Sequence, residues 1–258
     1  MEAGELALYL FLACGFVTLL QHPGSPVQRL IPDGIARRAA MGVAMGTAVT
    51  AIVFSPWGKR SGGHFNPALT FAYYRLGKVE FWDLCFYCAA QFLGAIAGVE
   101  LACLVLSGAP SNHAVNYAVT VPGMYGVTLA FAGELVISFV LMLTVLFVTN
   151  REALAPYTAF FVGALVTSYY TFESPLSGMS TNPARTAGSA FRADYWHAAW
   201  LYFLAPALGM LIATEAYLRI RGGAPPVCAK LRHCDGKLCI FHHDAPPPES
   251  RSRHSQNG

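Results

Sequence analysis

The sequence has few charged residues for its length. Its 258 residues include 17 Lys and Arg and 14 Asp and Glu, so 12% are charged, whereas soluble domains carry roughly 25%. A soluble protein of this size would need more charge to cover its surface. With 55% hydrophobic residues and a net charge of only +3, the composition also excludes disorder, a disulfide scaffold and a nucleic-acid partner. A polytopic membrane protein remains.

Six stretches are long and apolar enough to cross a hydrocarbon core, which takes ~20 residues per helix. They are residues 1–20, 37–55, 82–106, 126–149, 155–173 and 196–220. Two further apolar pieces, 66–74 and 182–191, are too short to cross. The first stretch contains Glu2 and Glu5 and no basic residue, so we expect a span rather than a cleaved signal peptide.

The distribution of Lys and Arg predicts that both termini are cytoplasmic. In that orientation the outer side receives fewer basic residues than the inner side, as the positive-inside rule requires. The outer residues are Arg29, Arg37, Arg38, Arg185 and Arg192. We therefore expect a multi-pass protein of the plasma membrane.

Three sequence matches relate the two halves of the chain. Ala-Gly-Glu-Leu at 3–6 recurs at 132–135, Asn-Pro-Ala at 66–68 recurs at 182–184, and Leu-Gly at 93–94 before Glu100 recurs at 208–209 before Glu215. Each half contains three spans, so the second copy must cross the membrane in the opposite orientation. The repeats would be about residues 1–110 and 126–221, with the working site near the midplane where they meet.

The two short apolar pieces both begin with Asn-Pro-Ala. Asn is a preferred N-cap and Pro fits the first helical position. Non-helical backbone at membrane depth occurs only where it is buried in protein or lines a wet cavity. We therefore expect Asn66 and Asn182 to begin half-helices that enter from opposite faces, with their positive dipole ends meeting near the centre.

These motifs resemble those of the aquaporin (major intrinsic protein) family, and most closely a bacterial-type water channel. The resemblance rests on residues 64–68, residues 182–185, Gln91 with 93–94, and residues 205–209, and it covers about residues 1–220. It implies an all-α membrane protein with six transmembrane helices and two re-entrant half-helices in an inverted repeat. It also implies a homotetramer in which every subunit conducts.

The resemblance implies a passive channel that conducts water in single file and excludes protons and ions. In the pore motifs Asn66-Pro67-Ala68 and Asn182-Pro183-Ala184, the Asn side chains would donate hydrogen bonds to the passing oxygen, and the half-helix dipoles would oppose cations. Arg185 would face the same lumen nearer the outside, as the charged donor of the selectivity filter.

The other filter positions are less typical of water channels. Counting back from Asn182 places Tyr170, or Thr171 if the loop shifts, where water channels usually have His. It places Met179 where they often have Cys. On the second span the aromatic position falls at Met45 or Gly46. These changes could widen the filter, so glycerol, ammonia and hydrogen peroxide stay open as alternatives.

The residues after the second motif favour water. Glycerol-conducting members usually carry Asp directly after Asn-Pro-Ala-Arg, whereas this chain has Thr186, followed by Ala190 and by the aromatic pair at 202–203. That combination resembles the water-selective branch. We therefore predict water as the main solute.

Two carboxylates are expected to support the re-entrant loops. Glu134 lies inside the fourth span, where an unpaired carboxylate would be costly. By resemblance it holds backbone groups of a loop, and the repeat assigns the same role to Glu5. Gly94, Gly98 and Gly209 are expected to allow close helix crossings.

Residues 222–258 form a Pro-rich tail that we expect to be cytoplasmic and disordered. Its candidate metal ligands are Cys228, His233, Cys234, Cys239 and His242. Thiolates and imidazoles suit Zn²⁺, although the spacings match no standard zinc pattern. A metal-responsive membrane regulator acting through the tail is thus an alternative of another class.

An enzyme is not expected, because the spans contain no Ser/His pair, carboxylate dyad or nucleotide-binding loop. No cofactor is expected either. The predicted partners are water or small neutral solutes, the lipid bilayer and further copies of the chain.

Overall fold

The computed structural model describes residues 1–232 and Phe241, which contain helices and loops and no strand. Five long helices are α1 (Glu2–Gln21), α3 (Gly34–Phe54), α6 (Phe81–Val105), α7 (Gly126–Thr149) and α11 (Ala199–Ile220). A sixth rod is continuous from α8 (Thr158–Ser168) through the π-helical turn η4 (Tyr169–Glu173) to α9 (Ser174–Ser177). Each of the six predicted spans is therefore a helical rod.

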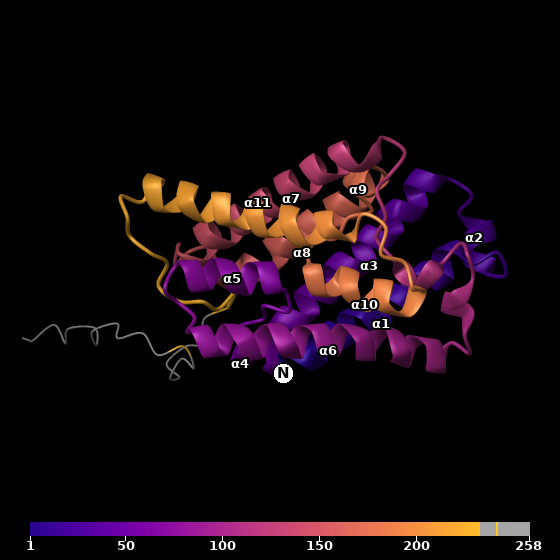
Figure 1. Ribbon diagram of the computed structural model, residues 1–258, viewed down its shortest axis with the longest axis horizontal. Coiled ribbons are helices and arrows are strands. Elements are labelled where there is room, and N and C mark those ends of the chain that lie inside the picture. The colour runs from indigo at the N-terminus through magenta and orange to yellow at the C-terminus, as the bar shows by residue number, and fades with distance from the viewer. Residues whose placement is uncertain (233–240, 242–258) are drawn as a thin grey trace, which may run out of the picture.

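Two short helices do not cross the bundle. They are α5 (Pro67–Arg75) and α10 (Pro183–Ala193), which lie end to end between α6 and α11 (Figure 1). The connecting segments contain α2 (Pro26–Leu30), α4 (Pro56–Ser61), η1 (Ala109–Ser111), η2 (Asn116–Ala118) and η3 (Ala155–Tyr157). Six rods and two half-helices confirm the predicted fold class.

Four helices in the described part of the chain are long and apolar enough to cross a membrane, namely α1, α6, α7 and α11. Large apolar side chains on their outer surfaces are exposed, including Phe86, Leu93, Leu104 and Leu204. A surface of this kind suits lipid or another subunit rather than water.

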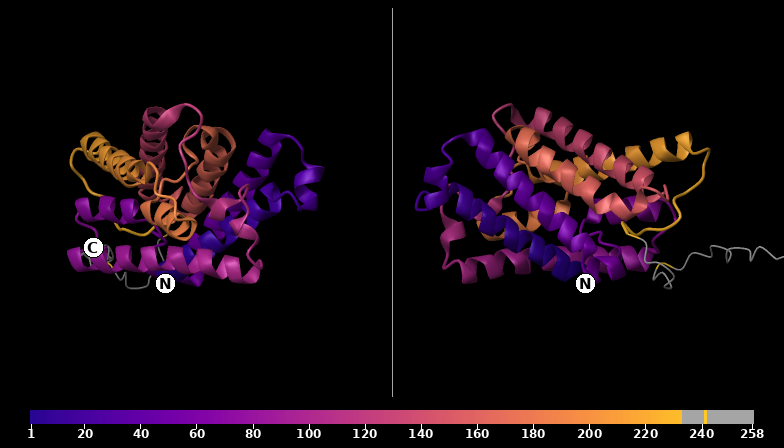
Figure 2. Two further views of the ribbon diagram at one scale, coloured as in Figure 1. Left: turned by 45° about the vertical axis from the view of Figure 1, so that its right-hand side comes forward. Right: turned by 180° about the vertical axis from the view of Figure 1, so that it is seen from behind.

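We call the end of the bundle that carries α4, Asn150 and residues 221–232 the tail face, and the other end the opposite face. The segment after α11 turns back across the tail face (Figure 2, right). The half-helix α5 ends there, where Arg75 pairs with Glu215 of α11 at 2.7 Å. At the end of α10, Arg192 pairs with Glu100 of α6 at 3.1 Å. Each half-helix is thus fastened to a helix of the other repeat.

The crossing of α3 and α8 shows the internal symmetry directly. The Thr50 hydroxyl donates to the Ala159 carbonyl at 3.1 Å, and the Thr167 hydroxyl donates to the Gly42 carbonyl at 3.1 Å. Gly46 and Gly163 let the two backbones approach between these bonds: a Cβ added to Gly46 would lie 2.4 Å from the Gly163 oxygen. Gly46 therefore packs α3 against α8.

The α1–α6 and α7–α11 crossings also correspond. A Cβ on Gly94 would lie 2.2 Å from the Ala3 oxygen, and a Cβ on Gly209 would lie 2.3 Å from the Leu135 oxygen. These close approaches confirm the expected role of both glycines. They also pair Ala3 with Leu135, so the Ala-Gly-Glu-Leu match between 3–6 and 132–135 is wrong in register by three residues.

Replacing Gly46 by Ala tests this packing. Because the added Cβ meets backbone that cannot move aside, we expect the free energy of unfolding to fall by ~1–3 kcal/mol, measured as a lower thermal midpoint in detergent. The matched control is Gly15→Ala in α1, where no described atom beyond the neighbouring backbone of its own helix lies within 4 Å of the new Cβ and Ala favours the helix. Unchanged stability with altered solute selectivity would instead place Gly46 at the lumen.

Candidate functional site

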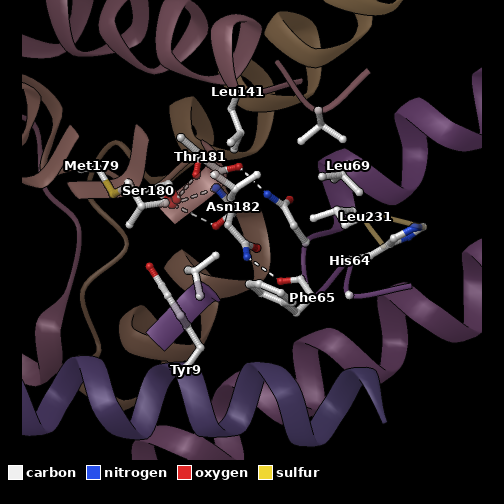
Figure 3. Close-up of a pocket in the computed structure, with 16 residues that line it drawn as sticks. Tyr9, His64, Phe65, Leu69, Leu141, Met179, Ser180, Thr181, Asn182 and Leu231 are labelled. Carbon is white, nitrogen blue, oxygen red and sulfur yellow. Dashed lines mark hydrogen bonds between the residues drawn. The ribbon is translucent and has the colours of Figure 1, made fainter. Parts of the chain in front are cut away.

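A cavity lies where the tips of the half-helices meet (Figure 3). Both re-entrant loops, α1, α3, α7 and α8 contribute to its wall. The lining residues include Tyr9, Val49, His64, Phe65, Asn66, Leu69, Val162, Met179, Ser180, Thr181, Asn182 and Leu231. Polar groups come from the two loops and most of the rest of the wall is apolar, which is the lining expected of a narrow water path.

The Asn side chains are held in one orientation by the helices that they cap. The Oδ1 atom of Asn66 accepts from Ala68 N at 3.0 Å, and that of Asn182 accepts from Ala184 N at 3.0 Å. Both predicted N-caps are confirmed. The Oδ1 atoms therefore face the helix ends, and the NH₂ groups face away from them.

Each Asn NH₂ group also binds the opposite loop. Asn66 Nδ2 donates to the Thr181 carbonyl at 2.8 Å, and Asn182 Nδ2 donates to the Phe65 carbonyl at 2.7 Å. An amide nitrogen carries two hydrogens, so one hydrogen joins the loops and the other is left for a solute. The arrangement supplies two adjacent donors at the centre of the cavity.

The carbonyls that accept these bonds belong to residues with a positive φ, in the left-handed region of backbone conformation. Phe65 has φ +29° and Thr181 has φ +54°, a conformation that is uncommon for large side chains. Such strain costs roughly 1–3 kcal/mol per residue and persists only when the surroundings enforce it. Buried carboxylates are the enforcing groups.

Glu134 of α7 supports the second loop, as predicted. Its carboxylate accepts from Ser180 N at 2.6 Å, from Thr181 N at 2.7 Å and from the Ser177 hydroxyl at 2.9 Å. Bonds from backbone amides to a carboxylate are among the strong hydrogen bonds in proteins. They fix the loop directly before Asn182.

In the first repeat two carboxylates share this role. Glu2 accepts from Phe65 N at 2.7 Å and from His64 N at 3.2 Å, and it is itself held by Gln91 at 2.6 Å. Among the described residues, the Glu5 carboxylate accepts only from the Ser61 hydroxyl, at 2.6 Å. Glu2, which the sequence reasoning missed, is thus the counterpart of Glu134. Glu5 supports the loop at Ser61, earlier in the chain than the amides that Glu2 binds.

Spacing along the chain could not have identified Glu2. Asn66 and Asn182 are 116 positions apart in the printed sequence, whereas Glu2 and Glu134 are 132 apart, because the segment between long helix and half-helix differs in length between repeats. The four-letter match at 3–6 drew attention to the wrong carboxylate. Only the contacts with the loop amides distinguish the two.

A second cavity opens on the opposite face and is lined by Arg185 and Tyr170, as well as Gln21, Arg38, Met41 and Gly178. Arg185 is 3% exposed, and its Nε and Nη1 atoms have no hydrogen-bond partner among the described residues. A buried guanidinium with free donors can bind a passing oxygen. Arg185 and Tyr170 therefore lie together, as the sequence predicted for a filter.

The remaining filter predictions have mixed outcomes. Met179 lines the central cavity beside Ser180. Met45 is fully buried on α3, one turn from Met41 in the outer cavity and one turn from Val49 in the central cavity, so it shares their face of the helix. The prediction that Gly46 belongs to the filter is wrong, because Gly46 packs against α8.

Sequence reasoning also missed Met41 and Tyr9. Met41 could have been found four residues before Met45, on the same helical face. The Tyr9 hydroxyl lies 3.3 Å from the Tyr170 hydroxyl, and this contact joins residues 161 positions apart. No local pattern could have predicted it.

The tail metal site is largely outside the described residues, which exclude His233, Cys234, Cys239 and His242. Cys228 is described and buried. Within residues 1–232 and Phe241, no group of three or more His, Cys, Asp or Glu side chains could hold a metal ion.

Two half-helices that meet tip to tip inside an inverted repeat of six helical rods define a membrane channel. The chain matches the major intrinsic protein family over residues 3–217 and belongs to that family, whose members are channels for water or small solutes rather than enzymes.

Aquaporin NIP2-3 of Zea mays is 31% identical over 224 residues, which cover 86% of this chain and 69% of the relative. Aquaporin NIP2-1 of Zea mays is 33% identical over 221 residues, which cover 85% of this chain and 70% of the relative. The X-ray structure of the aquaglyceroporin from Plasmodium falciparum is similar with a TM-score of 0.69 at 20% identity, covering 85% of this chain and 94% of that one. That similarity supports the fold. The two sequence relatives are plant proteins, so the bacterial type stays a prediction.

Glu2→Gln and Glu5→Gln form a matched pair that tests which carboxylate supports the first loop. At position 2 an amide nitrogen would face buried donors, and leaving one unsatisfied costs ~1–3 kcal/mol. We expect Glu2→Gln to lower the thermal midpoint and the solute permeability. Glu5→Gln keeps the acceptor for Ser61 and should change both little. A larger loss of stability and permeability in Glu5→Gln than in Glu2→Gln would instead identify Glu5 as the main support of the first loop.

Proposed function

We propose that the chain conducts water in single file through this pore and excludes protons and ions. The observation that carries the proposal is the fixed orientation of Asn66 and Asn182, each with one amide hydrogen left for a solute. A water that accepts from both donors has its lone pairs engaged, so it cannot also accept a proton from a neighbouring water. This interrupts a chain of hydrogen-bonded waters at the centre.

The half-helix dipoles oppose cations at the same point. The N-termini of α5 and α10 both face the centre, and each carries a partial positive charge. Arg185 adds a full charge nearer the opposite face, and its described surroundings contain no ion-pair partner for it. A cation would therefore meet positive potential twice along the path.

We favour water as the solute because large apolar and aromatic side chains lie between and beside the two cavities. Met45 is fully buried between the two cavities, and the hydroxyls of Tyr9 and Tyr170 lie 3.3 Å apart beside the path. The two Zea mays relatives carry the name aquaporin. A second candidate is another small neutral solute, such as glycerol, ammonia or hydrogen peroxide, because Gly178 and the flexible Met41 line the outer cavity.

We further propose the plasma membrane as the location, with both termini cytoplasmic, so that the tail face is the inner face. A homotetramer would cover part of the exposed apolar surface on the outer helices. The basic residues Lys59, Arg60, Arg75 and Arg151 lie in segments that end at the tail face, which agrees with the positive-inside rule.

Proteoliposomes under osmotic shock test the solute. Water efflux should be faster than from empty liposomes, with an Arrhenius barrier close to that of free water diffusion, while glycerol lags well behind. Stopped-flow light scattering measures both rates. Equal rates for water and glycerol would favour the second candidate. Rates equal to those of empty liposomes, both for the parent and for a folded variant with the cavity-lining Leu231 shortened to Ala, would reject a pore.

Arg185→Val tests the filter. Removing the guanidinium enlarges the path and deletes the charged donors, so we expect urea and glycerol permeability to rise by about tenfold or more while water permeability is retained. Isotope uptake into proteoliposomes measures the change. A matched control is Arg192→Val, at the end of α10 and half-exposed, which should leave selectivity unchanged. Continued exclusion of urea by the Arg185 variant would contradict the placement.

A further inference from the structure

The segment that follows α11 is buried against the pore loop although it is neither helix nor strand. After Gly222 and Gly223, both in the left-handed region, the chain runs back under the tail face (Figure 1). Its residues Cys228, Ala229, Lys230 and Leu231 are all buried. Irregular segments normally lie on the surface because their polar backbone needs water. Burial of four successive residues therefore requires hydrogen-bond partners within the protein.

The backbone partners lie in the loop that leads to Asn66. Leu231 N donates to the Gly62 carbonyl at 3.0 Å. The Ala229 carbonyl lies 2.6 Å from His64 Nε2, and a carbonyl can only accept, so Nε2 carries the hydrogen. These two bonds attach the segment to the residues on either side of Gly63. Gly62 lies four residues before Asn66, and His64 lies two residues before it.

Further contacts hold the two ends of the segment. Val227 N donates to the Asn150 side chain at 2.8 Å, just after α7. Lys230 Nζ donates to the Lys59 carbonyl at 3.3 Å, in the last turn of α4, and the Arg232 guanidinium lies 4.5 Å from the centre of the Phe54 ring. The segment thus spans the tail face from the end of α7 to α4.

His64 differs from its symmetry counterpart in a way that serves this contact. His64 Nδ1 lies 3.1 Å from the Thr70 hydroxyl, and in the other repeat the Ser180 hydroxyl lies 2.7 Å from that of Thr186. Both side chains therefore make the same internal bond. The imidazole has a second nitrogen, and that nitrogen reaches the segment.

The Leu231 side chain reaches the central cavity. It lines that cavity together with His64, Leu69 and Asn66 (Figure 3) and is 3% exposed. An isobutyl group offers no hydrogen bond to a water chain, and hydrophobic constrictions close pores by expelling water. The cavity on the opposite face is instead lined by polar groups such as Arg185, Gln21 and Ser174.

We propose that the loop before Asn66 carries a docking site for the chain's own residues 227–232, and that Leu231 closes the pore from the tail face while this segment is docked. The inference rests on the proposed function, because it assigns a regulator to the same pore. No covalent bond holds the docked segment among the described contacts, so undocking requires only that hydrogen bonds and apolar contacts be exchanged for water.

The test compares full-length variants in proteoliposomes by stopped-flow water efflux, normalised to the amount of reconstituted protein. Leu231→Ala shortens the side chain and should raise water permeability about threefold or more, with the low Arrhenius barrier retained. Leu231→Ser should do the same by wetting the constriction, and Leu231→Trp should lower permeability below that of the parent. Size-exclusion chromatography in detergent checks that each variant is folded.

Ile220→Ala is the matched control, at the end of α11 and outside the docking segment. Its side chain is 65% exposed, so permeability should equal that of the parent. Fast efflux from the parent with no change in folded Leu231→Ala and Leu231→Ser would overturn the docking proposal and leave the pore intact. Efflux equal to that of empty liposomes for the parent and both variants would overturn the pore and the regulator together.

Discussion

The pore depends on hydrogen bonds that join two irregular loops in the middle of the bundle. Asn66 and Asn182 each cap their own half-helix and donate to a carbonyl of the other loop. In a membrane an unsatisfied backbone group costs several kcal/mol, so the loops can exist at this depth only if such groups are paired. The same bonds orient the amide hydrogens that a solute would meet. The hydrogen bonds that stabilise the loops therefore also prepare the donors on which the proposed conduction depends.

The carboxylates extend this constraint into the long helices. Glu134 serves the second loop alone, whereas Glu2 and Glu5 divide the work in the first loop. A buried carboxylate is stabilised by hydrogen-bond donors around it, and the loop amides need acceptors, so Glu2 and Glu134 and the amides that they bind satisfy each other. Close crossings at Gly94, Gly209 and Gly46 bring the helices near enough for this exchange. The central cavity then lies at this polar centre, and the filter region with Arg185 lies between it and the opposite face.

The two mouths of the pore differ although the repeats are alike. On the opposite face Arg185 and Tyr170 line a polar cavity. On the tail face the chain after α11 binds the first loop and places Leu231 at the central cavity. One difference lies within the repeats, because Arg185 takes the position that Leu69 holds in the first repeat. The other difference comes from a segment outside the repeats. In our proposal selectivity is set at one mouth and regulation at the other.

The sequence by itself determined the fold class, the two half-helices, their N-caps and the neighbourhood of Arg185, because hydropathy, Asn-Pro and helical spacing act over a few residues. Tertiary structure decided which carboxylate meets which loop, that Gly46 packs against α8, that Tyr9 approaches Tyr170 and that Leu231 reaches the cavity. These outcomes depend on loop lengths and on the register of helix crossings, which join residues far apart in the chain. A local pattern carries no information about that register.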